Sequence, residues 1–532
     1  MLLHCNKLAA NAHVAVVGAG VGGLTFAYFL SKLRSDVKIT IIDAAERTGG
    51  WINSAVLDRG IDNTAVVLEK GPRTLRGKSE GTTLIVDTLR TLNHSDSVYY
   101  IEPDSDANRK FLLDTSDLLV QVPNSLSSLR RFLASSLGKG LLGGLLGEPF
   151  RKRNLITTED ESAHSLITRR FGSTTVSDNI FSAIFHGIYA GDIKQLSAKR
   201  TLAAIYKWEQ DYGSIIKGAL KSSPGGKGRP ILPQSLLKYQ KLFGRDPQEL
   251  SDLYSNLRKL PLLGLRKGLE TFPRALSAAL LENPKVHFLM GNGVSQIEAE
   301  QEGKMCISLT DGRVIKGLDH IRLTNTPQAI SQIIGYSNLQ KCLQRVKSNT
   351  VVLLNFYHPN KDLISKHHSF GYLVPQSNKN REQLLGVIFD SVIENNFKPL
   401  LGDKPYQKQS GRKLTYTKLT AMVGGHYLNH GQEKKIQDSS YYTEQVKKAL
   451  MRHLSIPEAE LECGEWQVTF ARDCLPQFFV GYDKWMAQTS ADLAKKYEGA
   501  ISLGGMAFSK GPGVPDVVMD GFEDAQSLAL TH

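Results

Sequence analysis

The residues with the clearest chemical meaning are three glycines near the N-terminus and an acid that follows them. Gly18, Gly20 and Gly23 have the spacing G-x-G-x-x-G, and Asp43 comes twenty residues after the last of them. The first glycine permits a tight turn, the second leaves room for a pyrophosphate beside bare backbone, and the third lets a helix pack closely. The phosphates would sit at the positive end of that helix, and the Asp43 carboxylate can accept both hydroxyls of a ribose.

The segments around these residues are the elements that such a site requires. An apolar run at 14–17 is short enough for one buried strand, and a second run at 39–42 ends directly before Asp43. Between the two runs, apolar residues recur at helical spacing, at Phe26, Phe29, Leu30 and Leu33. A glycine-rich turn without a ligand would not need these elements in register, so the pattern predicts a βαβ unit that binds a dinucleotide.

A second turn, after Asp43, indicates which dinucleotide is bound. It contains Arg47, Gly49, Gly50 and Trp51. This R-x-G-G turn resembles the second phosphate-contacting turn of flavin oxidases with the amine oxidase fold, which bind FAD rather than a diffusible nicotinamide. Those enzymes usually carry Glu at the Asp43 position, and Asp keeps the two acceptor oxygens on a side chain one methylene shorter.

Arg73 is the first candidate for contact with an anionic substrate. It follows Gly71 and Pro72, a pair that predicts a tight turn, and precedes Thr74. A guanidinium presented by such a turn is a planar, permanently charged fork that suits a carboxylate. An arginine on a surface loop has the same pattern, so the spacing alone leaves both interpretations open.

The composition describes a large globular protein with an excess of positive charge. The chain has 532 residues, 41% of them hydrophobic, so it can bury a large core and hold more than one domain. Lys and Arg outnumber Asp and Glu by 65 − 52 = 13, which favours an anionic partner. Because no nucleic-acid-binding motif is present, an acidic membrane surface or a carboxylate substrate is favoured over nucleic acid. The five cysteines form no CxxC pair, so neither a metal site nor a disulfide framework is expected.

Two features bear on localisation. The sequence has no run of 18 or more uncharged apolar residues, so no transmembrane helix is predicted. Residues 1–12 contain one lysine and no acid, and they are too few and too polar for a secretory signal. This leader is compatible with an uncleaved mitochondrial signal.

Residues 126–153 combine leucines with cations. Leucines recur near helical spacing from Leu126 to Leu145, although five glycines between 138 and 147 would weaken one long helix. Against a single acid, Glu148, the segment carries the cations Arg130, Arg131, Lys139, Arg151, Lys152 and Arg153. An apolar stripe rimmed by cations suits a helix in the interface of an anionic membrane, and the alternative is a core hairpin with a basic end. The cations make the membrane the favoured interpretation.

The C-terminal half returns to the pattern of the nucleotide domain. Short strands are expected at 286–289, 294–298 and 306–309. A further strand from Ile501, a glycine turn and a closing helix follow near the C-terminus. The nucleotide domain is therefore expected to be assembled from three separated pieces. Between them, a substrate-side antiparallel sheet is predicted from strands at 351–357, 384–390 and 421–423.

Over nearly its whole length the chain resembles the mitochondrial type of protoporphyrinogen oxidase. Two segments carry most of this resemblance, GPRTLR at 71–76 and GIYAGDIKQLSAKR at 187–200. Other matching segments are LLGLRKGLETFPRAL at 262–276, FGYLVP at 370–375, GGH at 424–426, DCLPQFFVGY at 473–482 and GPGVPD at 511–516. The resemblance implies a mixed α/β (α+β) fold. Its parts are a discontinuous Rossmann-like FAD-binding domain of the amine oxidase type, an antiparallel-sheet substrate domain and a helical membrane-docking domain.

The expected boundaries follow from the same resemblance. The FAD-binding domain is expected in three pieces, at 1–95, 256–326 and 463–532. The helical membrane-binding domain is expected at 96–205. The substrate domain is expected in two pieces, at 206–255 and 327–462.

The resemblance also implies an activity and partners. The family oxidises protoporphyrinogen IX to protoporphyrin IX with FAD and molecular oxygen. It removes six electrons and releases hydrogen peroxide, in the penultimate step of haem synthesis. A peripheral position on the mitochondrial inner membrane, against anionic lipid, is implied as well. Ferrochelatase and a second copy of the chain are the candidate protein partners.

Residue by residue, the resemblance implies two groups of contacts. Flavin contacts are implied for Gly18, Ala19, Gly20, Val21, Gly22, Gly23, Asp43, Arg47, Gly50, Trp51, Gly71, Pro72, Arg73, Thr74, Val294, Gly504, Pro512, Gly513 and Val514. For the substrate, Arg73 matches a propionate-binding arginine, and Phe370 matches an aromatic residue that packs on a pyrrole ring. Gly187 would leave the cleft wall bare beside the macrocycle. An ordinary core position is the alternative for Phe370.

The implied chemistry is hydride transfer from a meso carbon of the substrate to flavin N5. The protein contributes orientation and a dry site, and no side chain is assigned as an essential acid or base. His186 and His426 lie near matching segments and are interpreted as structural. Two rival functions stay open: another amine or polyamine oxidase, and a binding protein like the GDP-dissociation inhibitors, which share the fold without flavin.

Overall fold

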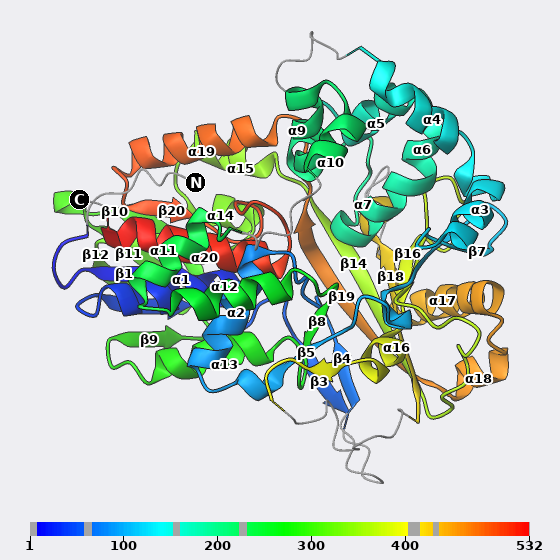
Figure 1. Cartoon of the computed structure of the whole chain (residues 1–532). Coiled ribbons are helices and arrows are strands. Elements are labelled where there is room, and N and C mark those ends of the chain that lie inside the picture. The colour runs from blue at the N-terminus through cyan, green and yellow to red at the C-terminus, as the bar shows by residue number, and fades with distance from the viewer. Residues whose placement is uncertain are drawn as a thin grey trace.

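The computed structural model describes residues 8–57, 66–152, 160–222, 231–402, 415–428 and 436–530. These residues form a half built on a parallel sheet, a half built on an antiparallel sheet, and a helical lobe (Figure 1). In Figure 1 the parallel half lies at the left, the antiparallel half at the lower right and the helical lobe at the upper right. Residues 1–7 of the leader and Arg153 lie outside the described residues.

The parallel half contains the predicted βαβ unit. Its five strands all run parallel, in the order β20 (Ile501–Leu503), β13 (His320–Leu323), β1 (His13–Val17), β2 (Lys38–Ile42) and β9 (Val286–Leu289). The strands come from the beginning, the middle and the end of the chain, which confirms the expected assembly from separated pieces. β1 and β2 are buried after their first residues, as expected for strands inside a parallel sheet, whereas the edge strand β9 is only partly buried.

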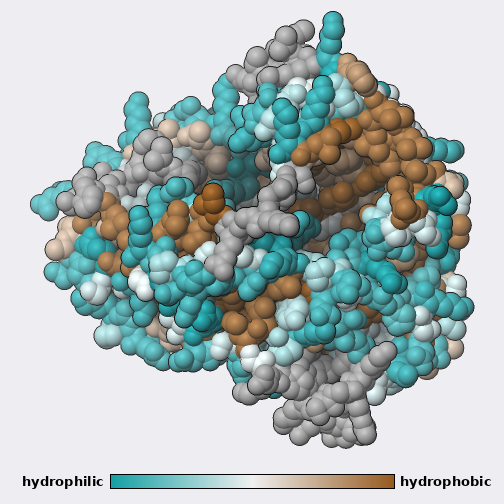
Figure 2. Space-filling view, viewed as in Figure 1, coloured by the Kyte–Doolittle hydropathy of each residue, from teal (hydrophilic) through white to brown (hydrophobic). Residues whose placement is uncertain are grey.

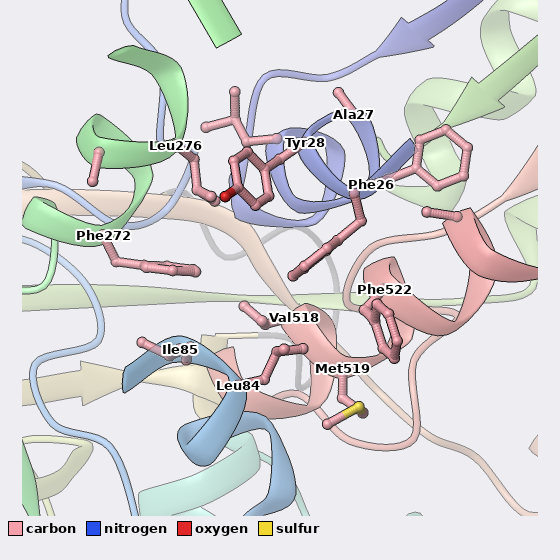
Figure 3. Close-up of a cluster of buried hydrophobic side chains, with 14 of the residues drawn as sticks. Phe26, Ala27, Tyr28, Leu84, Ile85, Phe272, Leu276, Val518, Met519 and Phe522 are labelled. Carbon is pink, nitrogen blue, oxygen red and sulfur yellow. The ribbon is translucent and has the colours of Figure 1, made fainter. Parts of the chain in front are cut away.

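Four helices from distant parts of the chain build the core beside this sheet. They are α1 (Val21–Leu33), α2 (Glu80–Thr91), α13 (Thr271–Leu281) and α20 (Val514–Leu530). Figure 3 shows Phe26, Phe272 and Phe522 from three of these helices converging with aliphatic side chains of α2. All three aromatic side chains are buried, so this core joins the first and last pieces of the chain around the glycine-rich loop.

The antiparallel half is a seven-stranded sheet. Its order is β19 (Glu465–Pro476), β14 (Ser348–His358), β18 (Thr417–Gly424), β16 (Leu384–Ile388), β15 (Gly371–Leu373), β6 (Lys110–Leu113) and β7 (Leu119–Gln121). All pairs are antiparallel except β15 with β6. Along β14, Val352 and Leu354 face the core beneath helix α17 (Ser439–Leu454), while Leu353 belongs to a second cluster on the opposite face. The three predicted strands of this sheet are confirmed as β14, β16 and β18.

The helical lobe is made of short helices. They are α3 (Leu126–Ala134), α4 (Leu141–Gly147), α5 (Ala163–Phe171), α6 (Thr174–Val176), α7 (Ser182–Tyr189), α8 (Ala198–Thr201), α9 (Ala203–Tyr212) and α10 (Ile215–Ser222). The break between α3 and α4 falls at Gly138–Gly140, as the glycines in this stretch predict, and Gly140 has φ +74°. The leucine-rich segment is therefore two short helices rather than one long helix.

An apolar patch covers the outer side of this lobe. Phe150 is 87% exposed, Leu126 80% and Leu146 75%, and Leu142 and Leu145 beside them are also exposed. Figure 2 shows hydrophobic surface over this part of the molecule, above a hollow with hydrophobic walls. We refer to the side chains of Leu126, Leu142, Leu145, Leu146 and Phe150 as the leucine patch. None of the helices in the described part of the chain has the length and hydropathy of a membrane span.

A buried ion pair holds the helical lobe together. Arg170 and Glu148 are both fully buried, and Arg170 donates from Nε to Glu148 Oε1 at 2.8 Å. Glu148 also accepts from the backbone N–H of Ile215 at 2.8 Å, and Arg170 donates from Nη1 to the Arg151 carbonyl at 2.9 Å. The network joins residues 148–151 to α5 and to the start of α10, so it fixes the lobe that carries the leucine patch.

Arg170→Met should therefore destabilise the lobe strongly. The substitution leaves the Glu148 carboxylate buried without its cation, which in other proteins costs about 3–5 kcal/mol. We expect a lower melting temperature and rapid proteolysis between α4 and α10. Arg130→Met, at an exposed arginine of α3, is the matched control and should change neither. Equal melting temperatures for the two variants would contradict the stabilising role of the pair.

Several elements differ from the expected domain boundaries. Helices α11 (Gln234–Leu242) and α12 (Pro247–Leu257), expected in the substrate domain, pack on α2 in the core of the parallel half. Helices α9 and α10 extend the helical lobe, whereas β6, β7 and β19 join the antiparallel sheet. An apolar face predicts that a segment is packed against another part of the protein, but it does not indicate which half that part belongs to.

The remaining elements connect these parts. The strands are β3 (Ser54–Leu57), β4 (Val66–Glu69), β5 (Val98–Tyr100), β8 (Leu263–Leu265), β10 (Val294–Ala299), β11 (Met305–Leu309), β12 (Val314–Leu318) and β17 (Lys398–Pro399). The helices are α14 (Pro327–Ile333), α15 (Ser337–Gln344), α16 (Asp390–Asn395), α18 (Glu458–Cys463) and α19 (Tyr482–Lys496). The predicted strands at 294–298 and 306–309 are confirmed as β10 and β11.

Candidate active site

The glycine-rich loop connects β1 to α1 and ends in a helix N-terminus without a side-chain cap. Gly20 is the N-cap residue, and no side chain accepts the first N–H groups of α1. The acid at the end of β2 lies beside this loop, because Asp43 Oδ2 accepts from the backbone N–H of Ala19 at 2.7 Å. Unpaired N–H groups at a helix N-terminus bind phosphate, so the loop has the chemistry of an anion site.

The three motif glycines differ in what surrounds them. A side chain on Gly23 would collide with the Gly18 carbonyl, so Gly23 is required for close packing within the protein. A Cβ on Gly20 would meet only the Cα of Gly50, at 3.8 Å, and the backbone of Gly20 is extended at φ −70° and ψ 172°. Among the residues that the structure describes, nothing requires glycine at position 20. The bare backbone there fits a ligand that approaches closely, as the pyrophosphate of FAD would.

The R-x-G-G turn lies directly against this loop. Gly49 donates its N–H to the Ala19 carbonyl at 2.8 Å, and Gly50 has φ +60°. Arg47 donates to the carbonyls of its own turn, including Ile52 at 3.2 Å. From the sequence, this turn is expected to contact phosphate. The structure places it against the glycine-rich loop, and the Arg47 guanidinium stabilises the conformation of the turn through hydrogen bonds to its carbonyls.

Thr324 is a central residue of the loop that the motif does not include. It follows β13 and donates from Oγ1 to the Val17 carbonyl at 2.9 Å. Its side chain fills the space beside Gly18 and Gly23, and its backbone carbonyl lies against Gly505. Only the parallel pairing of β1 with β13 brings this residue to the loop, so no local pattern could have indicated it.

The other candidate flavin residues have mixed surroundings. Val294 begins β10 close to the acid, because the N–H of Asn292 donates to the Asp43 carbonyl at 3.0 Å. A side chain on Gly22 would approach Val517 of α20 at 3.0 Å, so this glycine serves helix packing. The bare side of Gly504 is occupied by the buried Arg322 guanidinium rather than facing open space. Pro512 and Gly513 lead into α20, which begins at Val514.

The segment 71–74 lies between the two halves. Gly71 packs against the carbonyl of Trp51, so this segment touches the R-x-G-G turn. Arg73 Nη1 forms an ion pair with Asp390 Oδ1 at 2.6 Å, and each side chain is only 8% exposed. Thr420 of β18 donates to the other Asp390 oxygen at 2.7 Å. Arg73 is therefore buried and neutralised by an acid of the antiparallel half, which the sequence pattern did not indicate.

Further ionisable groups surround Arg73. Arg73, Thr74, Asp390, Glu394 and Lys418 line a pocket together with Glu69. Burial raises the pKa of Glu69 to about 7, against hydrogen bonds from Ser54 and the Leu269 backbone that favour the carboxylate. Lys418 pairs with Glu394 in the same pocket. The 71–74 segment, which touches the candidate cofactor site, is thus held by buried charges of the antiparallel half, two acids on α16 and Lys418 on β18.

Arg76, three residues after Arg73, has a different environment. Its side chain is exposed, and no described residue forms an ion pair with it. Burial lowers the pKa of Lys110 on β6, and the nearby charge of Arg76 lowers it further. Arg76 of the parallel half and Lys110 of the antiparallel sheet are therefore two cations that lie close to each other. Lys110 pairs in register with Gly371, next to Phe370.

Of the other two candidates for substrate contact, Phe370 lies on the antiparallel half and Gly187 lies on α7 of the helical lobe, facing that half. Phe370 is half-buried and packs on the core of that sheet, and its N–H donates to the Arg109 carbonyl at 2.8 Å. Gly187 is exposed on α7, where an added Cβ would approach Leu373 of β15 at 3.0 Å. Neither position excludes a neighbouring macrocycle, and Gly187 keeps α7 close to the sheet.

The structure brings together two histidines that lie 240 residues apart. His186 Nε2 lies 2.9 Å from His426 Nε2, and the rings are stacked with centroids 5.0 Å apart. His186 Nδ1 lies 2.6 Å from the Val374 carbonyl. Burial lowers the pKa of His186 to about 4, so this imidazole is neutral near pH 7. From the sequence, each histidine is interpreted as structural, and no sequence pattern predicts that His186 and His426 contact each other.

Comparison with known proteins agrees with this geometry. Residues 21–402 match the family described as flavin containing amine oxidoreductase. The chain therefore belongs to the flavin containing amine oxidoreductase family. A solved structure from Exiguobacterium sp. 255-15 has the same fold, with a TM-score of 0.71 at 18% identity over 98% of this chain and 100% of the other.

Within that family, several similar proteins of full length carry the name protoporphyrinogen oxidase. A protein named protoporphyrinogen oxidase from Saccharomyces cerevisiae is 46% identical over 99% of this chain and 100% of its own length. The human protein of the same name is 26% identical over 98% of both chains. Both similarities span all three parts of the structure. This protein is an FAD-dependent oxidoreductase, and the residues of the glycine-rich loop, the R-x-G-G turn and Asp43 fit that cofactor.

Proposed function

We propose that this protein oxidises protoporphyrinogen IX to protoporphyrin IX, with molecular oxygen as the final acceptor and hydrogen peroxide as the reduced product. The observation that carries this proposal is the 46% identity to a protein named protoporphyrinogen oxidase, which extends over 99% of the chain. The segments 71–76 and 187–200 carry the most specific resemblance to that family and support the proposal; Arg73 of the first pairs with Asp390 of the antiparallel half, and Leu196 of the second bridges to Phe479.

The residues of the chain would position the substrate rather than exchange protons with it. Bound FAD supplies the acceptor for a hydride from the meso carbon. The apolar face of the antiparallel sheet, with Leu353, Leu385 and Met422, offers a floor for an apolar macrocycle. Phe370 and Gly187 are proposed to contact the macrocycle from the sheet and from α7. Exclusion of water by these groups protects the reacting carbon.

The propionates of the substrate are proposed to meet the 71–76 segment. Arg73 is one candidate, although Asp390 already pairs with its Nη1 atom. A guanidinium carries five N–H donors, so one carboxylate does not by itself occupy them all. Arg76 is the second candidate, because it is exposed, lies near Lys110 and forms no ion pair with any described residue; the acid whose carboxyl its charge affects is Asp516.

An activity assay with two substrates tests the proposal. Purified protein is expected to be yellow and to convert protoporphyrinogen IX into a fluorescent porphyrin, with hydrogen peroxide formed alongside. Spermine, the substrate type of a polyamine oxidase, should give no peroxide. Peroxide from spermine without porphyrin formation would favour an amine oxidase. A colourless preparation that cannot be reconstituted with FAD would favour a binding protein.

The leucine patch is proposed to dock the protein on an anionic membrane. The support is its exposure, together with the neighbouring exposed cations Arg130, Arg131 and Lys139. Arg151 contributes less, because its guanidinium donates to the Arg170 carbonyl. The mitochondrial inner membrane is the proposed location. Ferrochelatase and a second copy of the chain are the proposed protein partners.

Leu146→Glu combined with Phe150→Glu should weaken this docking. Two carboxylates in the leucine patch oppose both apolar insertion and attraction to acidic lipid, so binding to anionic vesicles should fall at least about tenfold. Leu281→Glu, at a 66% exposed leucine of α13, is the matched control. Activity in detergent should be the same for all three proteins. Equal vesicle binding by the double variant and the control would contradict docking through this patch.

A further inference from the structure

The histidine pair has one arrangement of protons. The Val374 carbonyl can only accept, so His186 carries its hydrogen on Nδ1. In the neutral imidazole the Nε2 atom is then an acceptor, and His426 must donate from its own Nε2 to complete the 2.9 Å contact. The hydrogen bond is therefore directional, and it joins α7 of the helical lobe to residues 425–428, which follow β18.

The same junction is held by the backbone. Ala190, directly after α7, has φ +45°, and its carbonyl accepts from the His426 N–H at 2.8 Å and from Asn349 Nδ2 at 2.7 Å. A side chain at Gly425 would collide with that carbonyl. The end of α7 is thus tied to β14 and to the end of β18. The left-handed conformation of Ala190 is unfavourable for a residue with a side chain, so the attachments must hold it in place.

The position of α7 relative to the antiparallel sheet bears on the proposed substrate site, because Gly187 of this helix is proposed to lie beside the macrocycle. Ile184 is 38% exposed on this helix, and Gly187 is exposed one turn later. At the end of the helix, Ala190 packs in one cluster with Leu353 and Leu385 of the sheet. Figure 1 places α7 at the inner end of the helical lobe, where it packs against β15 and β16. A shift of α7 would therefore change the gap between the wall and the floor of the proposed substrate site.

We propose that His186 and His426 are positioning residues that latch α7 onto the substrate sheet and thereby set the width of the porphyrinogen site. This inference rests on the proposed oxidation of protoporphyrinogen. The surroundings support a positioning role. The Tyr427 ring packs against the His426 ring with centroids 4.1 Å apart, and Gln376 donates a hydrogen bond to Asp192, beside the pair, at 3.1 Å. The pair is held from several sides, as a latch requires.

The test compares two substitutions of His426. His426→Phe keeps a ring but removes the donor, whereas His426→Gln keeps an N–H donor that can reach His186. We expect His426→Phe to raise KM for protoporphyrinogen IX about tenfold, with kcat and flavin content within twofold of the wild type. His426→Gln should restore KM to within about threefold. His94→Phe, on an exposed turn of the parallel half, is the matched control.

A double-mutant cycle keeps the test decisive if one variant is unstable. His186→Leu removes the acceptor, and His186→Leu with His426→Phe should raise KM no more than either change alone, because both break one bond. Unchanged KM in His426→Phe, additive effects in the cycle, or a fall in kcat at constant KM would each overturn the latch. Failure of the underlying function would look different, because the wild type would then not oxidise protoporphyrinogen at all.

Discussion

Gly20→Ala is expected to abolish flavin binding while leaving the protein folded. The added methyl group would meet only Gly50 Cα at 3.8 Å within the protein, and the extended backbone of Gly20 suits any residue. The methyl group would instead occupy the space beside the N-terminus of α1 that a pyrophosphate needs. We expect FAD affinity to fall at least about 100-fold, which corresponds to about 2.7 kcal/mol.

Gly23→Ala should behave differently although it lies three residues away. Its methyl group would collide with the Gly18 carbonyl, so the loop and α1 would have to move apart. Overpacking of this kind costs about 1–3 kcal/mol or more, so we expect a lower melting temperature as well as lost flavin. Gly335→Ala, with no atom within 4 Å of the added Cβ, is the control for both variants.

Flavin content is measured as absorbance at about 450 nm after gel filtration, and folding is measured as melting temperature and far-UV circular dichroism. The two glycine variants should separate into a folded, colourless protein and a destabilised one. Full flavin content in Gly20→Ala would show that the bare backbone at this position does not face the cofactor, and the assignment of the loop would fail.

Arg73→Ala is the second change for which we expect a large effect. It leaves the Asp390 carboxylate buried and without its cation, and breaking a buried pair in this way costs about 3–5 kcal/mol. Because the 71–74 segment touches the R-x-G-G turn, the damage should reach the cofactor, and flavin retention should fall with stability. Asp390→Asn keeps a polar partner for Arg73 and should be milder on both measures.

Arg76→Ala separates substrate binding from stability. Arg76 is exposed, so its loss should leave the melting temperature and flavin content unchanged. If Arg76 contacts a propionate, KM should rise by about 10–100-fold, as expected for a lost charged hydrogen bond of about 1.5–3 kcal/mol. The dimethyl ester of the substrate, which has no carboxylate, is the control and should show no such rise. An equal change with free acid and ester would exclude a propionate contact.

The βαβ unit that carries the candidate cofactor site could be predicted from the sequence to a large extent. Gly18, Gly20, Gly23 and Asp43 act within one βαβ unit, where backbone geometry follows from residue type and spacing over about 30 residues. The strands at 351–357 and 384–390 were predicted for a similar reason, because an apolar strand is a local pattern. The expected domain boundaries differ more from the structure. Helices α11 and α12 pack on the parallel half, and their apolar faces do not indicate in the sequence which half will cover them.

The sequence by itself determined the nucleotide loop, the family and the separation of the cofactor domain into pieces. Only the tertiary structure decided that Arg73 pairs with Asp390, that Thr324 fills the space beside Gly18 and Gly23, and that His186 meets His426. The first set depends on local backbone conformation, which neighbouring residues specify. The second depends on how whole elements pack across 240 to 317 residues of sequence, and that arrangement is set by the shapes of buried surfaces rather than by any local spacing.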